Sequence, residues 1–200
     1  MKRAFALVAA IVLIFPAIAA QAAPVQWPVA AGGNDHWYEA VYVPNFITWT
    51  EADLASRSVG GHLATVAAEP ENQFIYSLIS DDKYWRYSNN MNGPWIGGYQ
   101  DLDAPDYSEP DGAWRWVTSE PMVYTNWATS QPDNGWAGTE HCLHFFGWLN
   151  EKSSKWNDAR NVEPILGYVV EYDVIPEPSG LISLVGGLCG LAKLIRRQRR

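Results

Sequence analysis

Side-chain oxygens are concentrated in two short segments of this 200-residue chain. A loop-like stretch contains Gln131, Asp133, Asn134 and Glu140, and Asn157 and Asp158 follow further along. All are hard oxygen donors, and no histidine or cysteine at zinc spacing stands among them. Calcium takes about six to eight such oxygens in a loose geometry that suits a site assembled from loops, whereas magnesium demands tighter octahedral packing. The pattern therefore indicates a calcium site, with a solvated acidic surface as the alternative.

Two helices and a set of short strands are expected to position these donors. Thr48 and Glu51 form a capping-box pattern at the start of the first helix, and Gly60-Gly61 ends that run. Pro70 occupies the favoured first position of a second helix. Strands are predicted over 37–43, 95–99, 113–117, 141–146 and 167–172. The fold class is therefore α+β, with a small antiparallel sheet and long irregular loops, which usually carry function.

Acidic residues dominate the central part of the chain more strongly than the overall net charge of −8 indicates. Setting aside the first 23 and the last 25 residues leaves 7 basic and 21 acidic residues, all of them between positions 24 and 173, and a net charge of −14. A nucleic-acid binder needs a basic face to neutralise phosphates, and this composition excludes one. It also disfavours an anionic membrane surface as partner and favours a cation.

Both ends of the chain are predicted to be targeting segments. Met1-Lys2-Arg3 precedes an almost unbroken apolar run over 4–20, and Ala20-Gln21-Ala22 offers a small-x-small cleavage site. This pattern is typical of a secretory signal peptide over residues 1–22, with a retained anchor helix as the alternative. The apolar run over 181–195 is shorter than the roughly 20 residues that cross a bilayer. The arginines after it would hold that end on the cytoplasmic side.

The tail over 176–200 resembles the PEP-CTERM sorting signal of Gram-negative bacteria, because a Pro-Glu-Pro motif, an apolar stretch and an arginine cluster follow one another. The resemblance implies recognition by an exosortase-type processing enzyme, removal of the tail, and delivery to the cell surface or extracellular matrix. A plain tail anchor in the inner membrane, transient or retained, is the alternative. In either case we expect the globular part to work outside the cytoplasm and to meet a membrane only through its tail.

A series of short motifs over residues 35–173 resembles a C-type lectin-like domain in composition and in order. Any one of them would be weak evidence, but together they are specific. They are, in chain order, WTEA at 49–52, GGHLA at 60–64, WIGG at 95–98, WRWV at 114–117, YTNW at 124–127, EHC at 140–142, WND at 156–158 and GYVVE at 167–171. The resemblance implies the C-type lectin-like fold for this domain.

The resemblance also implies roles for the oxygen donors. Gln131-Pro132-Asp133 matches the tripeptide that sets sugar specificity, with a cis peptide bond before the proline. Glu140, Asn157 and Asp158 fall on the remaining ligand positions of the principal calcium site. In the family, two neighbouring sugar hydroxyls coordinate the calcium and accept or donate hydrogen bonds with its ligands. The resemblance thus implies a calcium-dependent carbohydrate-binding protein.

The Gln-Pro-Asp order of residues 131–133 resembles galactose-type members of the family. Such members present an aromatic ring from the glycine-containing loop, and Trp136 is the candidate, with packing under the loop as the alternative. The carbohydrate-binding set is then Gln131, Asp133, Trp136, Glu140 and Asn157. Asn134 and the acidic segment 101–111 are candidates for an auxiliary calcium site, although solvated loop acids are the better interpretation for most of that segment.

Cysteine use departs from the family pattern. Ser56 and Val170 take the positions of one framework disulfide, and Cys142 has Asn161 where its partner is expected. The only other cysteine, Cys189, lies in the tail, so no disulfide within the domain is possible. Stability must come from burial, to which the 11 tryptophans contribute.

Three other functions compete with carbohydrate binding. On a strand, Cys142 and His144 share one face while His141 points away, which leaves too few donors for a zinc site and favours a buried thiol. Paired carboxylates could serve a glycoside hydrolase, but here they are engaged as metal ligands. We therefore predict no catalytic residues and no enzymatic activity. The main rival is a surface or matrix module that uses the same fold for structural or protein contacts without sugar.

Overall fold

The computed structural model describes residues 22–175. The predicted tail over 176–200 and all but the last residue of the predicted signal peptide lie outside the described residues. Within the described part, no helix is both long and apolar enough to cross a membrane.

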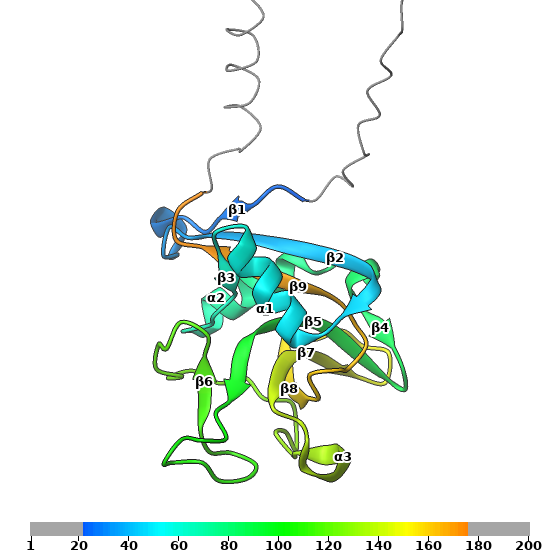
Figure 1. The fold of residues 1–200 in the computed structure, drawn as a ribbon. Helices are drawn as coiled ribbons and strands as arrows, with labels where there is room; N and C mark the ends of the chain where they lie inside the picture. The colour runs from blue at the N-terminus through cyan, green and yellow to red at the C-terminus, as the bar shows by residue number, and fades with distance from the viewer. Residues whose placement is uncertain (1–21, 176–200) are drawn as a thin grey trace, which may run out of the picture.

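A nine-stranded sheet forms the centre of the domain (Figure 1). Its main path runs in the order β1-β2-β9-β5-β7-β8, while β3 pairs with β9, and β4 and β6 pair with β5. The strands are β1 (Val25–Gln26), β2 (Trp37–Ile47), β3 (His62–Leu63), β4 (Arg86–Tyr87), β5 (Asn90–Gln100), β6 (Trp114–Trp116), β7 (Cys142–Trp148), β8 (Lys155–Ala159) and β9 (Ile165–Tyr172). The α+β class is confirmed.

The sheet differs from the prediction in two ways. It is mixed rather than purely antiparallel, because β5 and β9 run parallel and pair Trp95 with Tyr168. It is also larger than predicted, since β1, β4 and β8 were not foreseen. The strand β8 carries Asn157 and Asp158, two of the predicted calcium ligands.

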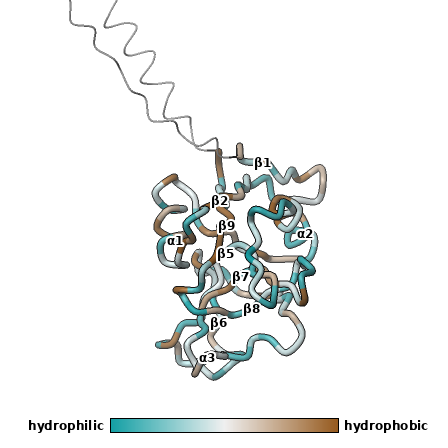
Figure 2. The backbone as a smooth tube through the Cα atoms, turned by 90° about the vertical axis from the view of Figure 1, so that its right-hand side faces the viewer, coloured by the Kyte–Doolittle hydropathy of each residue, from teal (hydrophilic) through white to brown (hydrophobic). Residues whose placement is uncertain are grey.

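Two helices lie on opposite sides of the sheet (Figure 2). The first, α1 (Trp49–Ser58), begins with the predicted capping box: Thr48 Oγ1 accepts from the Glu51 amide, and the Glu51 carboxylate accepts from the Thr48 amide. The second, α2 (Glu69–Leu78), begins with proline in its first turn, as predicted. A short helix, α3 (Gly135–Gly138), lies at the far end of the domain from β1 (Figure 1), and two 3-10 turns span Val29–Ala31 and Asp82–Tyr84.

Aromatic residues fill the interior, as the absence of a disulfide requires. Trp95, Trp116 and Trp156 are among the largest fully buried side chains. One cluster of buried residues joins Ile75 of α2 to Trp116 and Trp156, and a second joins Ala52 of α1 to Trp95. Each helix thus covers its own face of the sheet, and β8 is fixed through Trp156.

Two buried glutamates, Glu71 of α2 and Glu171 of β9, were not predicted. They are 4% and 1% exposed. The Tyr38 hydroxyl donates to Glu71 Oε1 at 2.6 Å and lies 3.1 Å from Glu171 Oε1. His36 Nδ1 lies 2.7 Å from Glu171 Oε1, and the Thr65 amide donates to Glu171 Oε2 at 2.8 Å. Burial raises the pKa of Glu71, and the hydrogen bonds from the Tyr38 hydroxyl and the Ala67 amide act against that rise. The network therefore offsets part of the cost of burying carboxylates.

Replacing Tyr38 by phenylalanine is expected to lower the free energy of unfolding by about 2 kcal/mol, because a hydrogen bond to a buried charged group is lost. Urea unfolding of the variant measures the change. The matched control is Tyr84→Phe, whose hydroxyl donates to the neutral Ala40 carbonyl oxygen at 3.2 Å and should be worth about 1 kcal/mol. Equal losses in the two variants would show that the carboxylates do not depend on Tyr38.

Candidate metal centre

The loop that leads from β6 to β7 is held against β8 by hydrogen bonds. The peptide bond between Gln131 and Pro132 is cis, as predicted. The Asp158 carboxylate of β8 accepts from the Asp133 amide at 3.2 Å and from the Asn134 amide at 2.7 Å. Asn134 Oδ1 in turn accepts from the Glu140 amide at 3.0 Å, which closes the turn that contains α3. These bonds place donors from the loop and from β8 next to one another.

Three carboxylates meet where the loop touches β8. Asp133, Glu140 and Asp158 each offer an oxygen, and these oxygens all lie within 4.8 Å of one another. Glu140 and Asp158 are buried, at 7% and 1% exposure, while Asp133 is exposed. Gly135 permits this approach, because a Cβ atom there would lie 2.7 Å from Glu140 Oε2. Among the described residues, this is the one group of three acidic, histidine or cysteine side chains close enough to share an ion.

The carboxylates are poorly stabilised as anions by the protein alone. Burial, together with the negative charges of Asp158 and Asp133, raises the pKa of Glu140 to about 7. Burial also raises the pKa of Asp158, against the hydrogen bonds it accepts from the loop amides. Crowded carboxylates disfavour each other's charged form, and a bound cation would relieve that repulsion.

Two amide oxygens beside the carboxylates have no hydrogen-bond donor among the described residues. Gln131 Oε1 and Asn157 Oδ1 are buried and accept no hydrogen bond. The Asn157 amide nitrogen is engaged, by the Asp158 carbonyl oxygen and by His144 Nε2 at 3.4 Å. A buried acceptor without a partner costs about 1–3 kcal/mol, and a cation would satisfy both oxygens. The residues present therefore fit a hard divalent cation such as calcium.

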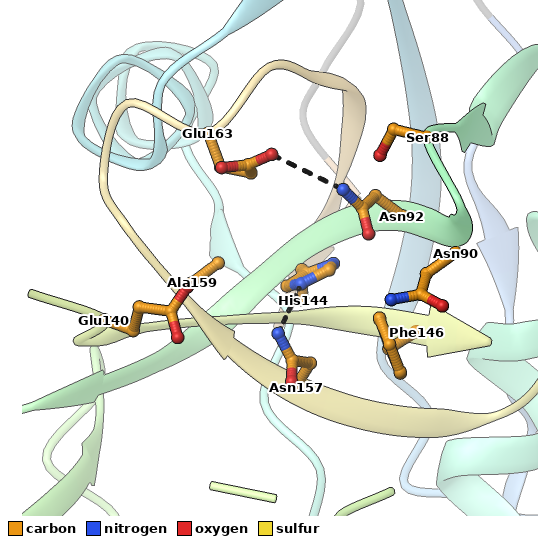
Figure 3. A pocket seen from close by; sticks show the side chains of 9 residues that line it. All are labelled: Ser88, Asn90, Asn92, Glu140, His144, Phe146, Asn157, Ala159 and Glu163. Carbon is orange, nitrogen blue, oxygen red and sulfur yellow. Dashed lines mark hydrogen bonds between the residues drawn. The ribbon is translucent and has the colours of Figure 1, made fainter. Parts of the chain in front are cut away.

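Two adjoining cavities open beside these donors. One, of about 290 Å³, is lined by Gln131, Asp133, Glu140 and Asn157 together with Gly135, Asn90, Phe146 and Trp148. The other, of about 190 Å³, shares Glu140, Asn157, Asn90 and Phe146 with the first and is shown in Figure 3. Sequence reasoning missed Asn90, Phe146 and Trp148 as lining residues.

The five predicted ligand side chains are thus brought to one place. One cavity is lined by Gln131, Asp133, Glu140 and Asn157. Asp158 lies next to them, because one of its carboxylate oxygens is within 4.8 Å of oxygens of Asp133 and Glu140. That they bind a metal stays a prediction. Trp136 belongs to α3, in the same turn as Gly135, but its side chain lies outside what the structure describes.

The acidic segment 101–111 forms no comparable centre within the described residues. Asp101 Oδ1 accepts from the Asp103 amide, and Asp106 pairs with Arg115. These carboxylates are engaged locally, as expected for loop acids.

Cys142 is a free, buried thiol, as predicted. Burial raises its pKa to about 12 and lowers that of His144 to about 4, so neither is charged near neutral pH.

Ser56 and Val170, at the positions of the missing disulfide, are fully buried. Asn161 stands where the family pattern has the disulfide partner of Cys142. Its Oδ1 atom accepts a hydrogen bond from the Thr50 amide at 2.9 Å and so holds the start of α1.

The pH dependence of metal binding should follow Glu140. Its pKa of about 7 lies above the usual 4.5, so between these values the native chain binds a proton that the unfolded chain lacks. The stability of the metal-free protein should therefore fall as pH rises from about 4.5 to about 7. Calcium needs the carboxylate deprotonated, so its affinity should fall by up to about tenfold per pH unit below pH 7. Calcium titrations at pH 6 and pH 8 measure this, and equal dissociation constants would exclude Glu140 as a ligand.

The fold and the site together define a loop-rich α+β domain with a cluster of oxygen donors at one end. Residues 46–164 match the family model of the Lectin C-type domain. The chain belongs to this family, whose members are generally not enzymes.

Several curated proteins are similar to this chain. Perlucin from Haliotis laevigata is 31% identical over 134 residues, which cover 67% of this chain and 76% of perlucin. The type-2 ice-structuring protein of Hemitripterus americanus is 31% identical over 93 residues, 46% of each chain. Ladderlectin from Oncorhynchus mykiss is 27% identical over 118 residues, 59% of this chain and 54% of ladderlectin. The chain thus spans about half the length of the last two relatives.

Solved structures share the fold at lower identity. The C-type carbohydrate-recognition domain of cow CD23 has a TM-score of 0.52 at 23% identity, covering 70% of this chain and 89% of that one. A calcium-independent type II antifreeze protein has a TM-score of 0.52 at 20% identity, covering 78% and 98%. These likenesses show the fold alone.

Proposed function

We propose that this protein is a calcium-dependent carbohydrate-binding protein. The observation that carries the proposal is the meeting of three crowded carboxylates with two buried amide oxygens that lack hydrogen-bond donors. Each feature is unfavourable without a cation, and one cation would relieve both. The family membership and the lectins among the relatives support sugar as the ligand.

The five proposed ligands would have different roles in holding the calcium ion and the sugar. Asp133, Glu140 and Asp158 would neutralise the ion, while Gln131 and Asn157 would contribute neutral oxygens. Calcium, when bound, offers coordination positions to two neighbouring sugar hydroxyls. The cavity is lined by Gln131, Asp133, Glu140 and Asn157. The carboxylates would accept hydrogen bonds from those hydroxyls and the Gln131 amide would donate one, while the Asn157 amide would exchange its 3.4 Å contact with His144 Nε2 for a hydroxyl oxygen. Asp158, buried behind the loop, would hold the loop and the ion together.

A galactose-type preference is part of the proposal. It rests on the Gln131-Pro132-Asp133 order and on Trp136, whose backbone in α3 belongs to the same turn as the cavity-lining Gly135. The ring of Trp136 would stack on the apolar face of the sugar.

The targeting segments complete the proposal. We place a signal peptide at residues 1–22, the lectin domain at 35–173 and a PEP-CTERM-type tail at 176–200. The protein would be exported to the cell surface or extracellular matrix of a Gram-negative bacterium, after exosortase processing or with an inner-membrane tail anchor. An acidic domain with an exposed glycan-binding site fits that location.

Affinity chromatography tests the proposal. The protein should be retained on galactose resin in calcium and released by a chelator. Retention on mannose resin instead would overturn the galactose preference but not the proposed calcium-dependent mechanism. A protein that passes through both resins, and whose thermal stability does not change with calcium, would be a structural or protein-binding module on the same fold.

A further inference from the structure

One face of the sheet continues from the candidate metal centre along the hairpin of β7 and β8 and onto β5. His144, Phe146 and Trp148 alternate along β7 and therefore point to one side. Across the strands, His144 is paired with Asn157, as the ladder register requires. Directly opposed residues share a face, so this side of β7 is continuous with a proposed calcium ligand.

The strand β5 adds two amides to the same face. Phe146 is opposed by Asn92, and Trp148 by Asn90. We call these four residues the β5–β7 face. Its side chains line the two cavities that also contain Glu140 and Asn157. Figure 3 shows Asn90 and Asn92 on one side of the space and Glu140 on the other. The two cavities therefore extend beyond the candidate metal centre, along β5 and β7.

The β5–β7 face combines an exposed ring with hydrogen-bonding amides. Trp148 is 45% exposed although it packs edge-on against Phe146, with ring centroids 4.9 Å apart at 84°. Phe146 is buried and fixes the position of that ring. Single exposed aromatic residues are common on protein surfaces, but this one lies beside asparagines whose amides can both donate to and accept from hydroxyls. Rings and amides in one groove suit a sugar, whose faces are apolar and whose edges are polar.

We propose that the β5–β7 face is a second saccharide subsite, which holds the next residue of a neutral oligosaccharide whose terminal residue occupies the metal centre. The inference rests on the proposed function and extends it, because the protein would then bind at least a disaccharide. The nearby carboxylates of Asp133, Glu140 and Asp158 would repel uronic and sialic acids, so the ligand is neutral. Trp148 supplies the stacking surface, and Asn90 supplies hydrogen bonds.

Binding of paired ligands tests the subsite. Methyl β-galactoside and a panel of neutral galactose-terminated oligosaccharides, lactose included, are titrated into the protein in calcium, and matching mannose-terminated ligands are titrated in parallel. We expect at least one oligosaccharide to bind about 3- to 10-fold more tightly than its terminal monosaccharide, the range that an aromatic contact supplies. Trp148→Ala and Asn90→Ala should each reduce this gain, while the monosaccharide dissociation constant stays within about twofold.

A second readout follows Trp148 itself. Its indole N–H resonance, assigned by comparison with Trp148→Phe, should shift when the oligosaccharide binds and stay in place with the monosaccharide. The control variant is Tyr42→Ala, which removes a ring of similar exposure, 42%, from β2 and should change neither affinity.

Each outcome decides something different. If no oligosaccharide binds more tightly than its monosaccharide, or if Trp148→Ala weakens both alike, the subsite is overturned and the proposed function stands. If neither ligand binds in calcium, the proposed function fails and the subsite fails with it. Thermal unfolding of each variant confirms that it is folded.

Discussion

Replacing Glu140 by glutamine should make the metal-free protein more stable and, at the same time, abolish its stabilisation by calcium. At pH 8 the wild-type carboxylate is ionised against its raised pKa of about 7 and against Asp158 and Asp133. The full shift corresponds to roughly 3 kcal/mol, and solvent at the cavity mouth screens part of it, so we expect a gain of about 1–2 kcal/mol. Urea unfolding in a chelator and in calcium measures both effects.

The opposite signs separate this account from a purely structural role for Glu140. A glutamate that only stabilised the loop would lower stability in both conditions when replaced. The control is Asp103→Asn, which removes an exposed loop carboxylate and should leave both unfolding curves close to those of the wild type. Loss of stability in the chelator would contradict the repulsion described for the three carboxylates.

Replacing Asp158 by asparagine should weaken calcium binding by about 100-fold or more and eliminate calcium-dependent retention on galactose resin. Loss of a group that only supports a metal ligand costs about 10- to 100-fold, and Asp158 is itself a proposed ligand. The two carboxylate oxygens of Asp158 accept from different amides, Oδ1 from Asp133 at 3.2 Å and Oδ2 from Asn134 at 2.7 Å. Asparagine keeps the shape and one acceptor oxygen, so it can retain the shorter bond from Asn134 while the longer bond from Asp133 is lost. Thermal unfolding in a chelator measures the cost of that lost bond, and calcium titration reports the missing charge.

A buried carboxylate outside the site provides the comparison. Glu39 is 9% exposed and accepts a hydrogen bond from the Tyr172 hydroxyl at 2.7 Å. Glu39→Gln is expected to change stability without changing calcium affinity. If Asp158→Asn still binds sugar in calcium as the wild type does, calcium coordination is not the mode of recognition.

Much of the fold could be predicted because its signals are local. The capping box of Thr48 and Glu51 fixes the start of α1 by contacts within one turn, and Pro70 does the same for α2. The strands β2, β5, β6, β7 and β9 were each found in part, since apolar and aromatic residues mark them.

The elements that were missed depend on distant parts of the chain. The β8 segment contains Asn157 and Asp158, residue types depleted in strands, and it is held by pairing with β7 and by the burial of Trp156. The first half of β5 contains asparagine, glycine and proline, so pairing with β4 and β7 decides its conformation.

Some features of the candidate site could likewise be predicted from the sequence, and others could not. Residue types indicated a set of oxygen donors, and the resemblance to C-type lectin-like domains selected five of them. Neither indicated the hydrogen bonds by which Asp158 holds the loop. Trp148 carried a signal that was overlooked, because it continues the alternation of His144 and Phe146. The predicted strand ended at residue 146, and the aromatic residue beyond it was therefore left unassigned.

Terbium luminescence tests the central claim most directly. Tb³⁺ takes the place of calcium at oxygen sites, and its emission lifetime lengthens when bound water is displaced. We expect one ion to bind, to be displaced by calcium, and to gain lifetime when galactose is added, because sugar hydroxyls replace water at the metal. Terbium binding that is unchanged by Glu140→Gln and Asp158→Asn, or a lifetime that no sugar alters, would contradict the account.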